Sequence, residues 1–442
     1  MSERPRPLPP VFQAVLRPLQ TFFALEVAGG LLLVAASALA LGWANSPWAA
    51  SYRALLDHPL GLQVGAFRAD FPLHVLVNDV LMTVFFAVVG MEIKRELVLG
   101  ELRTPARALL PAIAAAGGMA VPGLVYLAFN GGKPTSSGWA IPMATDIAFS
   151  IGVLTLVRSR VHHGLVVFLT ALAIFDDLGG ILVIALFYGT GLHAEWLAGA
   201  AGVTGLLLLF NRYGVRNGVA WLLGTAGLWA CLHHGGIHAT LAGVVVGMCV
   251  PARGRISPGE VLEALRKHVE GLGRKPEEEE LEAGEILQIE ETLEDLEAPL
   301  NRFVHMLHPW VVYGILPLFA FMNAGVGLGG GGGLSWTSPV ALGVGLGLLI
   351  GKPVGIFFTT LLAVKSGFAP MPGDASRLQL FGVSVVAGIG FTVALFVAAL
   401  SFPGQDGVLD AAKLGIISGS LTSAVLGYLV LRLAPPPGPE TR

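Results

Sequence analysis

The chain has 442 residues, of which 54% are hydrophobic and only 13% are charged. A soluble protein carries roughly 25% charged residues, so this composition excludes an ordinary soluble domain and indicates a polytopic membrane protein. The net charge of −3 gives no sign of a nucleic-acid partner, and the 59 glycines are typical of membrane helices, in which glycine is commoner than in soluble ones.

Twelve apolar segments are candidates for membrane helices. A helix needs about 20 mostly apolar residues to cross the hydrocarbon core of a bilayer. By this measure we predict an all-α membrane protein with about 12 helices, of which the second is unusually polar and the eighth is short. We expect no cleavable signal peptide before the first. The approximate helix cores are 22–44, 75–93, 108–129, 140–157, 164–188, 195–211, 218–233, 237–250, 309–326, 340–363, 379–400 and 413–432.

The basic residues alternate between the segments that connect these helices. Of the 27 Lys and Arg residues, 22 lie in the two termini and in the loops after helices 2, 4, 6, 8 and 10, and four lie in the other loops. Cytoplasmic loops carry an excess of Lys and Arg. We therefore expect both termini to be cytoplasmic.

Two loops have features of their own. The first external loop contains the alternating stretch "GLQVGAFRADF" around Gly65, which predicts a small β-hairpin. The long cytoplasmic loop is acidic, and Ser257–Glu260 within it reads as a capping box that starts a helix. We interpret this loop as a solvated helical pair that rests on the membrane domain, with a partner-binding or ion-attracting role as the alternative.

The chain therefore divides into five parts along its length. They are a cytoplasmic N-terminal segment, membrane helices 1–8, an acidic cytoplasmic insert, membrane helices 9–12 and a disordered cytoplasmic tail. Their boundaries are 1–21, 22–252, 253–304, 305–432 and 433–442.

Five charged residues lie deep inside the predicted helices: Asp79, Asp146, Asp176, Asp177 and Lys352. A charge at a bilayer centre costs about 2.5–3.5 kcal/mol on insertion scales. For Asp79, a structural role, in which a buried hydrogen bond neutralises the carboxyl group, is as good an explanation as a functional role. Asp176 and Asp177 lie about 100° apart around one helix, so we expect two distinct roles for them. Lys352 can release its proton in a buried site, whereas an arginine would stay charged.

Two predicted helices contain a break at matching depth. The fourth carries Pro142 followed by Thr145 and Asp146, and the eleventh carries Gly388 and Gly390. Paired broken helices at equivalent points of two halves are typical of transporters built from inverted repeats, whose ion site lies at the midplane. We predict that the two breaks cross there and that Asp146 offsets the positive helix N-termini that meet at the crossing.

Seven collinear blocks resemble the bacterial NhaA-type sodium/proton antiporters, and they lie between about Ala28 and Arg432 outside the acidic insert. The resemblance implies an inverted-repeat transporter in the bacterial inner membrane that exchanges Na⁺ and Li⁺ for H⁺, with net charge movement and regulation by pH. It implies no enzyme activity and no cofactor. Members of that family are transporters built from inverted repeats. The blocks are "VGMEIKRELVLGEL" (89–102), "GWAIPMATDIAFSIGVL" (138–154), "LTALAIFDDLGGILVIALFY" (169–188), "GIHATLAGVVVG" (236–247), "HMLHPWVVYGILPLFAFMNAGV" (305–326), "LIGKPVGI" (349–356) and "GIGFTVALF" (388–396).

The resemblance also implies roles for residues at matching positions. Asp177 and Asp176 would be the sodium-binding and proton-carrying carboxylates. Thr145 and Asp146 would lie at the crossing of the broken helices, with Lys352 as the counter-charge there and the partner of Asp176. A pH response would involve a cytoplasmic funnel and one further histidine, with these residues: Glu92, Arg95, Glu96, His305, His308 and His238.

Three further features follow from the same resemblance. The hairpin near Gly65 would join two subunits of a homodimer. Many members carry a glutamate at the position of Val304, and they have a shorter loop in place of the acidic insert. Both departures concern the pH response rather than the transport site.

The predicted mechanism is competition for one site. Na⁺ prefers oxygen ligands, as other hard cations do, and a carboxylate holds either that ion or a proton. Exchange follows if only loaded forms reorient between the two faces of the membrane. Two alternatives are a cation channel, which a lysine at the crossing opposes, and an intramembrane aspartyl protease. The Gly-x-Gly-Asp motif of that protease class is absent, since Phe391 follows Gly390.

Overall fold

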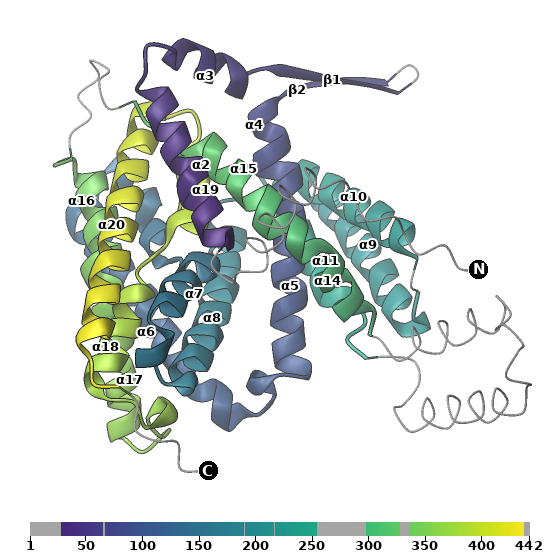
Figure 1. Ribbon diagram of the computed structural model, residues 1–442. Helices are drawn as coiled ribbons and strands as arrows, with labels where there is room; N and C mark the ends of the chain where they lie inside the picture. The colour runs from purple at the N-terminus through teal and green to yellow at the C-terminus, as the bar shows by residue number, and fades with distance from the viewer. Residues whose placement is uncertain are drawn as a thin grey trace, which may run out of the picture. The chain divides into compact units, whose positions relative to one another are not determined.

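In the computed structural model the described chain is almost entirely helical (Figure 1). The structure describes residues 28–64, 67–189, 191–215, 217–253, 298–327 and 336–436. The N-terminal segment 1–21, Gly65, the capping box at Ser257–Glu260, nearly all of the acidic insert and the end of the tail lie outside these residues. The described residues divide into two compact units. The first lies within Met1–Asn78, Pro105–Val183 and Val312–Arg442, and the second lies within Asp79–Thr104 and Ile184–Val311.

The first unit contains most of the helices. They are α2 (Ala28–Ala44), α3 (Ala49–Leu56), α4 (Leu73–Val75), α6 (Pro105–Asn130), α7 (Ile147–Leu156), most of α8 (His163–Phe187), α15 (Leu316–Ala324), α16 (Pro339–Leu346), α17 (Lys352–Lys365), α18 (Arg377–Val386), α19 (Phe391–Ser401) and α20 (Asp406–Leu433). Shorter 3₁₀ and π-helical turns join them: η3 (Pro134–Met143), η4 (Arg158–Arg160), η5 (Val311–Ile315), η6 (Gly347–Gly351) and η7 (Pro372–Asp374).

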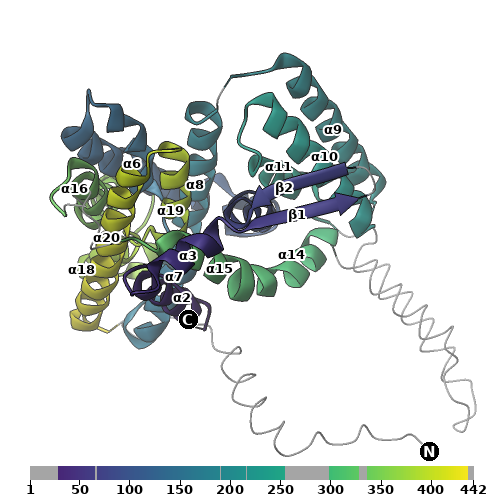
Figure 2. The same cartoon turned by 90° about the horizontal axis from the view of Figure 1, so that it is seen from above.

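The second unit is smaller. Its helices are α5 (Met82–Val98), which the π-helical turn η1 (Leu76–Leu81) precedes, the short η2 (Glu101–Arg103), α9 (Ala194–Tyr213), α10 (Gly218–Gly235), α11 (Leu241–Cys249) and α14 (Pro299–Trp310). Helices α9 and α10 pack side by side (Figure 2), and α5 packs against both α11 and α14. Gly90, Gly243 and Gly247 allow the close approach of α5 and α11, because a Cβ atom at any of them would collide with the backbone of the other helix.

Among the described residues, seven helical stretches are long and apolar enough to cross a membrane, or ten if each bent pair counts as one span. An all-α polytopic membrane protein is therefore confirmed, whereas the number of twelve stays a prediction. Within the predicted eighth segment, 237–250, the α-helix α11 has only nine residues.

Both predicted helix breaks are present. Helices η3 and α7 are bent by 43° around residues 144–146, and α18 and α19 are bent by 47° around residues 387–390. The first break follows Pro142, and the second contains Gly388 and Gly390. Each break leaves backbone groups outside a helix, and these groups need other partners.

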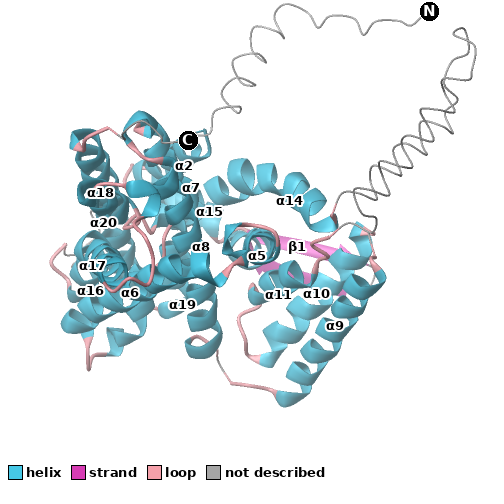
Figure 3. Cartoon of the chain, turned by 90° about the horizontal axis from the view of Figure 1, so that it is seen from below, coloured by secondary structure: helices cyan, strands magenta, loops and turns pink. Residues whose placement is uncertain are grey.

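The predicted hairpin is also present. Strands β1 (Pro59–Val64) and β2 (Phe67–Pro72) pair antiparallel, with Val64 opposite Phe67 at the turn and Pro59 opposite Pro72 at the open end. Figure 3 draws this hairpin in magenta.

Close helix packing positions the start of α17 in the first unit. Gly355 of α17 lies against the backbone of Gly117 in α6, and Gly351 lies against Pro122 of the same helix. A side chain at either glycine would collide with α6. Helix α20 packs on α16, α18 and α19 (Figure 1), so it borders the second break.

Candidate functional site

A buried ion pair joins Asp176 of α8 to Lys352 at the start of α17. The Lys352 Nζ lies 2.9 Å from the Asp176 Oδ2, and both side chains are 0% exposed. Two charges withdrawn from water in this way need each other, because removal of either partner would leave the other uncompensated. Lys352 also donates a hydrogen bond to the carbonyl oxygen of Met143, the last residue of η3. The cation thus lies at the negative C-terminal end of that helix.

The two carboxylate oxygens of Asp176 differ in their hydrogen bonds. Its Oδ2 accepts a hydrogen bond of 2.8 Å from the Thr145 hydroxyl in addition to the lysine. Within the described part of the chain, its buried Oδ1 has no hydrogen-bond partner. A buried carboxylate oxygen of this kind is suited to take a proton or a cation, because an unpaired polar atom is costly away from water.

Asp177 follows Asp176 directly on α8 and is only partly buried. The helical rotation between neighbours points the two carboxylates in different directions. One acid is therefore held in the protein interior by Lys352, and its neighbour is more accessible.

Asp146 holds the N-termini of two helices. Its Oδ1 accepts a hydrogen bond of 3.0 Å from the backbone N–H of Phe149 in α7. Its Oδ2 accepts from the backbone N–H and the hydroxyl of Thr392 in α19, at 3.1 and 2.6 Å. The N-terminal end of each helix carries positive partial charge, so one carboxylate neutralises both ends.

Further hydrogen bonds tie the two breaks together. The Asp146 N–H donates to the Ile389 carbonyl oxygen at 2.6 Å, and the Ser150 hydroxyl donates to that of Val386 at 3.3 Å. The Thr145 hydroxyl also lies 3.0 Å from the carbonyl oxygen of Ala387. The two breaks therefore form one connected hydrogen-bonded structure.

Two residues of this structure were not predicted from the sequence. Thr392 donates two hydrogen bonds to Asp146, and Ser420 of α20 accepts hydrogen bonds from the N–H groups of Gly390 and Phe391 at the start of α19. The signal for Thr392 is its place two residues after Gly390, where the first turn of α19 begins. No comparable local signal marks Ser420.

The predicted pH-response residues lie in the second unit. Glu92, Arg95 and Glu96 are on α5, and His305 and His308 are on α14, which packs against α5. The Glu96 carboxylate accepts a hydrogen bond of 3.2 Å from the Glu101 N–H.

The sixth of these residues, His238, lies between α10 and α11. Its Nδ1 is 3.0 Å from the Thr240 hydroxyl oxygen.

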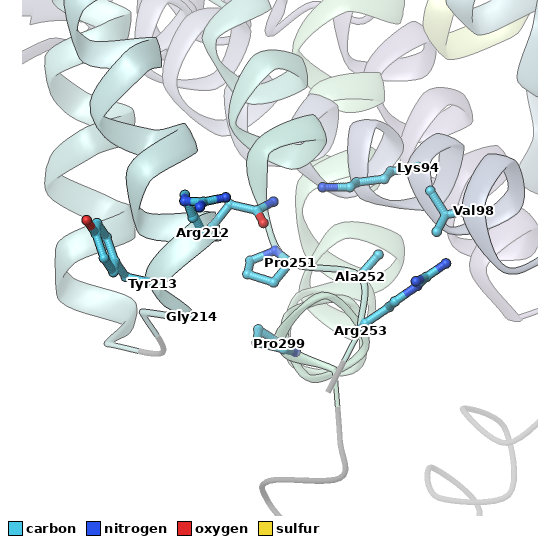
Figure 4. Close-up of a pocket in the computed structure, with 10 residues that line it drawn as sticks. Lys94, Val98, Arg212, Tyr213, Gly214, Pro251, Ala252, Arg253 and Pro299 are labelled. Carbon is cyan, nitrogen blue, oxygen red and sulfur yellow. The ribbon is translucent and has the colours of Figure 1, made fainter. Parts of the chain in front are cut away.

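A cavity of about 370 Å³ lies in the same unit (Figure 4). Lys94, Arg212 and Arg253 are among its lining residues. The Lys94 Nζ donates to the carbonyl oxygens of Met248 and Val250, at 2.8 and 2.6 Å. This cation therefore stabilises the negative C-terminal end of α11.

The described residues contain no group of three or more His, Cys, Asp or Glu side chains placed to hold a metal ion. Asp176, Thr145 and the carbonyl group of Ala387 are among the groups that place oxygen atoms near the breaks.

Comparisons with known proteins give one consistent result. A family model described as Na⁺/H⁺ antiporter 1 matches residues 20–431. The Na⁺/H⁺ antiporter NhaA of Anaeromyxobacter sp. (strain Fw109-5) is 56% identical over 429 residues, which are 97% of this chain and 94% of the relative. NhaA 1 of Myxococcus xanthus (strain DK1622) is 57% identical over 98% of this chain and 97% of its own length. NhaA of Pseudomonas putida (strain GB-1) is 44% identical over 93% of this chain and 96% of its own length.

Proposed function

The chain belongs to the Na⁺/H⁺ antiporter 1 family, and from this premise we propose that Asp176 and Asp177 carry its exchange of Na⁺ for H⁺. The protein is a membrane transporter and not an enzyme. The observation that supports these two residues is the buried ion pair between Asp176 and Lys352, beside a carboxylate oxygen without a partner in the described chain.

Competition between the two ions explains exchange at such a site. When Na⁺ is absent, Asp176 pairs with Lys352, and Asp177 takes a proton. When Na⁺ arrives, Asp177 binds it through oxygen, and Asp176 and the Thr145 hydroxyl supply further oxygen atoms. Only a loaded site changes the face to which it is open, so protons move in one direction when Na⁺ moves in the other.

Asp146 has a different role in this proposal. Both of its oxygens already accept hydrogen bonds from helix N-termini. A carboxylate whose two oxygens are both bonded in this way holds the two breaks together and sets the electrostatic potential at the site. It does not bind the transported ion.

The same proposal covers properties of the whole transporter. We propose Li⁺ as a second substrate, two protons exchanged for each Na⁺, and regulation by pH through Glu92, Arg95, Glu96, His238, His305 and His308. We also propose that both termini lie on the cytoplasmic side of the bacterial inner membrane, as the alternation of basic residues supports. The hairpin would join two copies of the chain at the external face. Within the described residues β1 and β2 pair only with each other, and the edges of such strands can pair with another chain.

The test is proton flux in sealed proteoliposomes when Na⁺, Li⁺ or K⁺ is added across a series of pH values. An antiporter moves protons when Na⁺ or Li⁺ is added. A cation channel would dissipate the Na⁺ gradient without obligatory proton movement, and that result would contradict the proposal.

A further inference from the structure

Three backbone N–H groups at the start of α19, including that of its N-cap residue Gly390, donate to side chains outside this helix. A helix leaves its first four N–H groups without partners of its own. The Thr392 N–H donates to Asp146, whereas the Gly390 and Phe391 N–H groups both donate to the Ser420 hydroxyl oxygen, at 3.3 and 3.2 Å. Ser420 comes from α20 and is only 3% exposed. A neutral oxygen of the last helix therefore completes the cap of α19.

A second serine on α20 provides an internal comparison. Ser423 lies almost one turn after Ser420 and is 0% exposed, next to Gly388 of the same break. Its Oγ has no hydrogen-bond partner in the part of the chain that the structure describes. The two serines share a helix, a chemistry and a buried environment, and they differ in whether they cap α19.

Ser420 is needed because the carboxylate of Asp146 is shared between the N-termini of two helices. The N-terminus of a helix carries roughly half a positive elementary charge. Asp146 serves two such ends, and only one of its oxygens faces α19. The N–H groups of Gly390 and Phe391 would stay unpaired in a buried position without the serine oxygen, and an unpaired buried N–H group destabilises the fold.

We propose that Ser420 is a positioning residue for cation binding, which acts by holding the N-terminus of α19 against Asp146. The proposal rests on the proposed function of Asp176 and Asp177. Ser420 fixes the first turn of α19, and Thr392 in that turn holds Asp146. Asp146 follows Thr145, whose hydroxyl donates to Asp176. Without the serine oxygen, the positive helix end is less well screened and opposes a cation at the aspartates.

The experiment compares Ser420→Ala with the matched control Ser423→Ala. Two quantities are measured for each purified variant: the Na⁺ concentration that gives half-maximal proton flux, and the Na⁺ concentration that gives half-maximal thermal stabilisation in detergent. We expect Ser420→Ala to raise both concentrations about three- to tenfold, as the electrostatic effect of a helix end allows. Maximal flux per folded protein stays near wild type, and Ser423→Ala changes neither concentration.

A purely structural serine gives a different result. It would lower the unfolding temperature without moving either half-saturating concentration, and that outcome overturns the proposal. An equal shift in Ser423→Ala also overturns it, because loss of any buried hydroxyl would then suffice. If Ser420→Ala does not fold, Ser420→Cys decides in the same two assays, since its sulfur is a weaker acceptor of similar size. A wild-type protein without Na⁺-driven flux would contradict the proposed function instead, and the thermal assay would still report Na⁺ binding.

Discussion

Asp146 and Thr392 are 246 positions apart in the chain and meet through two hydrogen bonds, one from the backbone N–H and one from the hydroxyl. The other oxygen of the same carboxylate caps α7 through Phe149. Asp146 is thus bonded at both oxygens, whereas Asp176 is bonded at one and has no partner for the other within the described residues. This difference supports the proposal that Asp146 is a fixed charge, which holds two helix ends, and that Asp176 takes part in ion exchange.

Thr392→Val tests the role of Asp146 as a fixed charge. Valine keeps the shape and the backbone N–H of residue 392 but removes the hydroxyl that donates to Asp146. A hydrogen bond to a charged group contributes about 1.5–3 kcal/mol, so we expect a clearly lower unfolding temperature in detergent. Thr392→Ser keeps the hydroxyl and serves as the control. Equal stability of the valine variant and the wild type would show that the bond contributes little.

Asp177→Asn tests the carboxylate that we propose binds Na⁺. Asparagine has nearly the same size, but it carries neither a charge for Na⁺ nor a proton that can be released. We expect Na⁺-driven proton flux to be lost while the protein stays folded, as judged by size-exclusion chromatography and thermal unfolding. Near-normal flux in a folded variant would remove Asp177 from the site.

Local sequence patterns predicted the parts of the site that have local causes. Pro142 and the glycines at 388 and 390 marked the breaks, since each of these residues interrupts a helix or allows it to bend. The pairing of Asp176 with Lys352 came from the family resemblance, because no local pattern links positions on two different helices.

The sequence could not identify Ser420, for a physical reason. Helix α20 contains four hydroxyl residues within six positions, namely Ser418, Ser420, Thr422 and Ser423. Ser418 and Thr422 donate to carbonyl oxygens four residues earlier in their own helix. Only the packing of α20 on α19 decides which hydroxyl caps the break, and that packing is tertiary.

Deletion of residues 271–296 tests the acidic insert. The segment Pro276–Leu300 contains eleven Asp and Glu residues, and none of the proposed transport residues lies in the insert. We expect turnover at the optimal pH to be retained. The midpoint of the pH profile should shift, because an acidic segment raises the local concentration of cations and protons. Flux measured across a pH series checks both expectations, and loss of all transport in a well-folded deletion would make the insert part of the core mechanism.

Lys352→Gln tests which group carries the second proton. Lys352 pairs with Asp176 in the structure, and we propose that binding of Na⁺ at Asp177 loosens this pair. A buried lysine without its anion releases its proton readily, because desolvation disfavours the charged form. In the alternative account Asp176 releases the second proton and Lys352 is mainly structural. Two protons oppose one Na⁺ in both accounts, so exchange moves net charge.

The two accounts differ in what the glutamine variant does to the membrane potential. If lysine is the carrier, a folded Lys352→Gln protein is inactive or exchanges ions without net charge, because one of the two protons has lost its site. If lysine is structural, the variant unfolds at a lower temperature, since Asp176 and the Met143 carbonyl group lose their cation, but its residual exchange still generates a potential. A voltage-sensitive dye in sealed vesicles after a Na⁺ jump, together with thermal unfolding in detergent, separates these results. We expect the lysine to be the carrier, and wild-type voltage generation by Lys352→Gln would assign the second proton to Asp176.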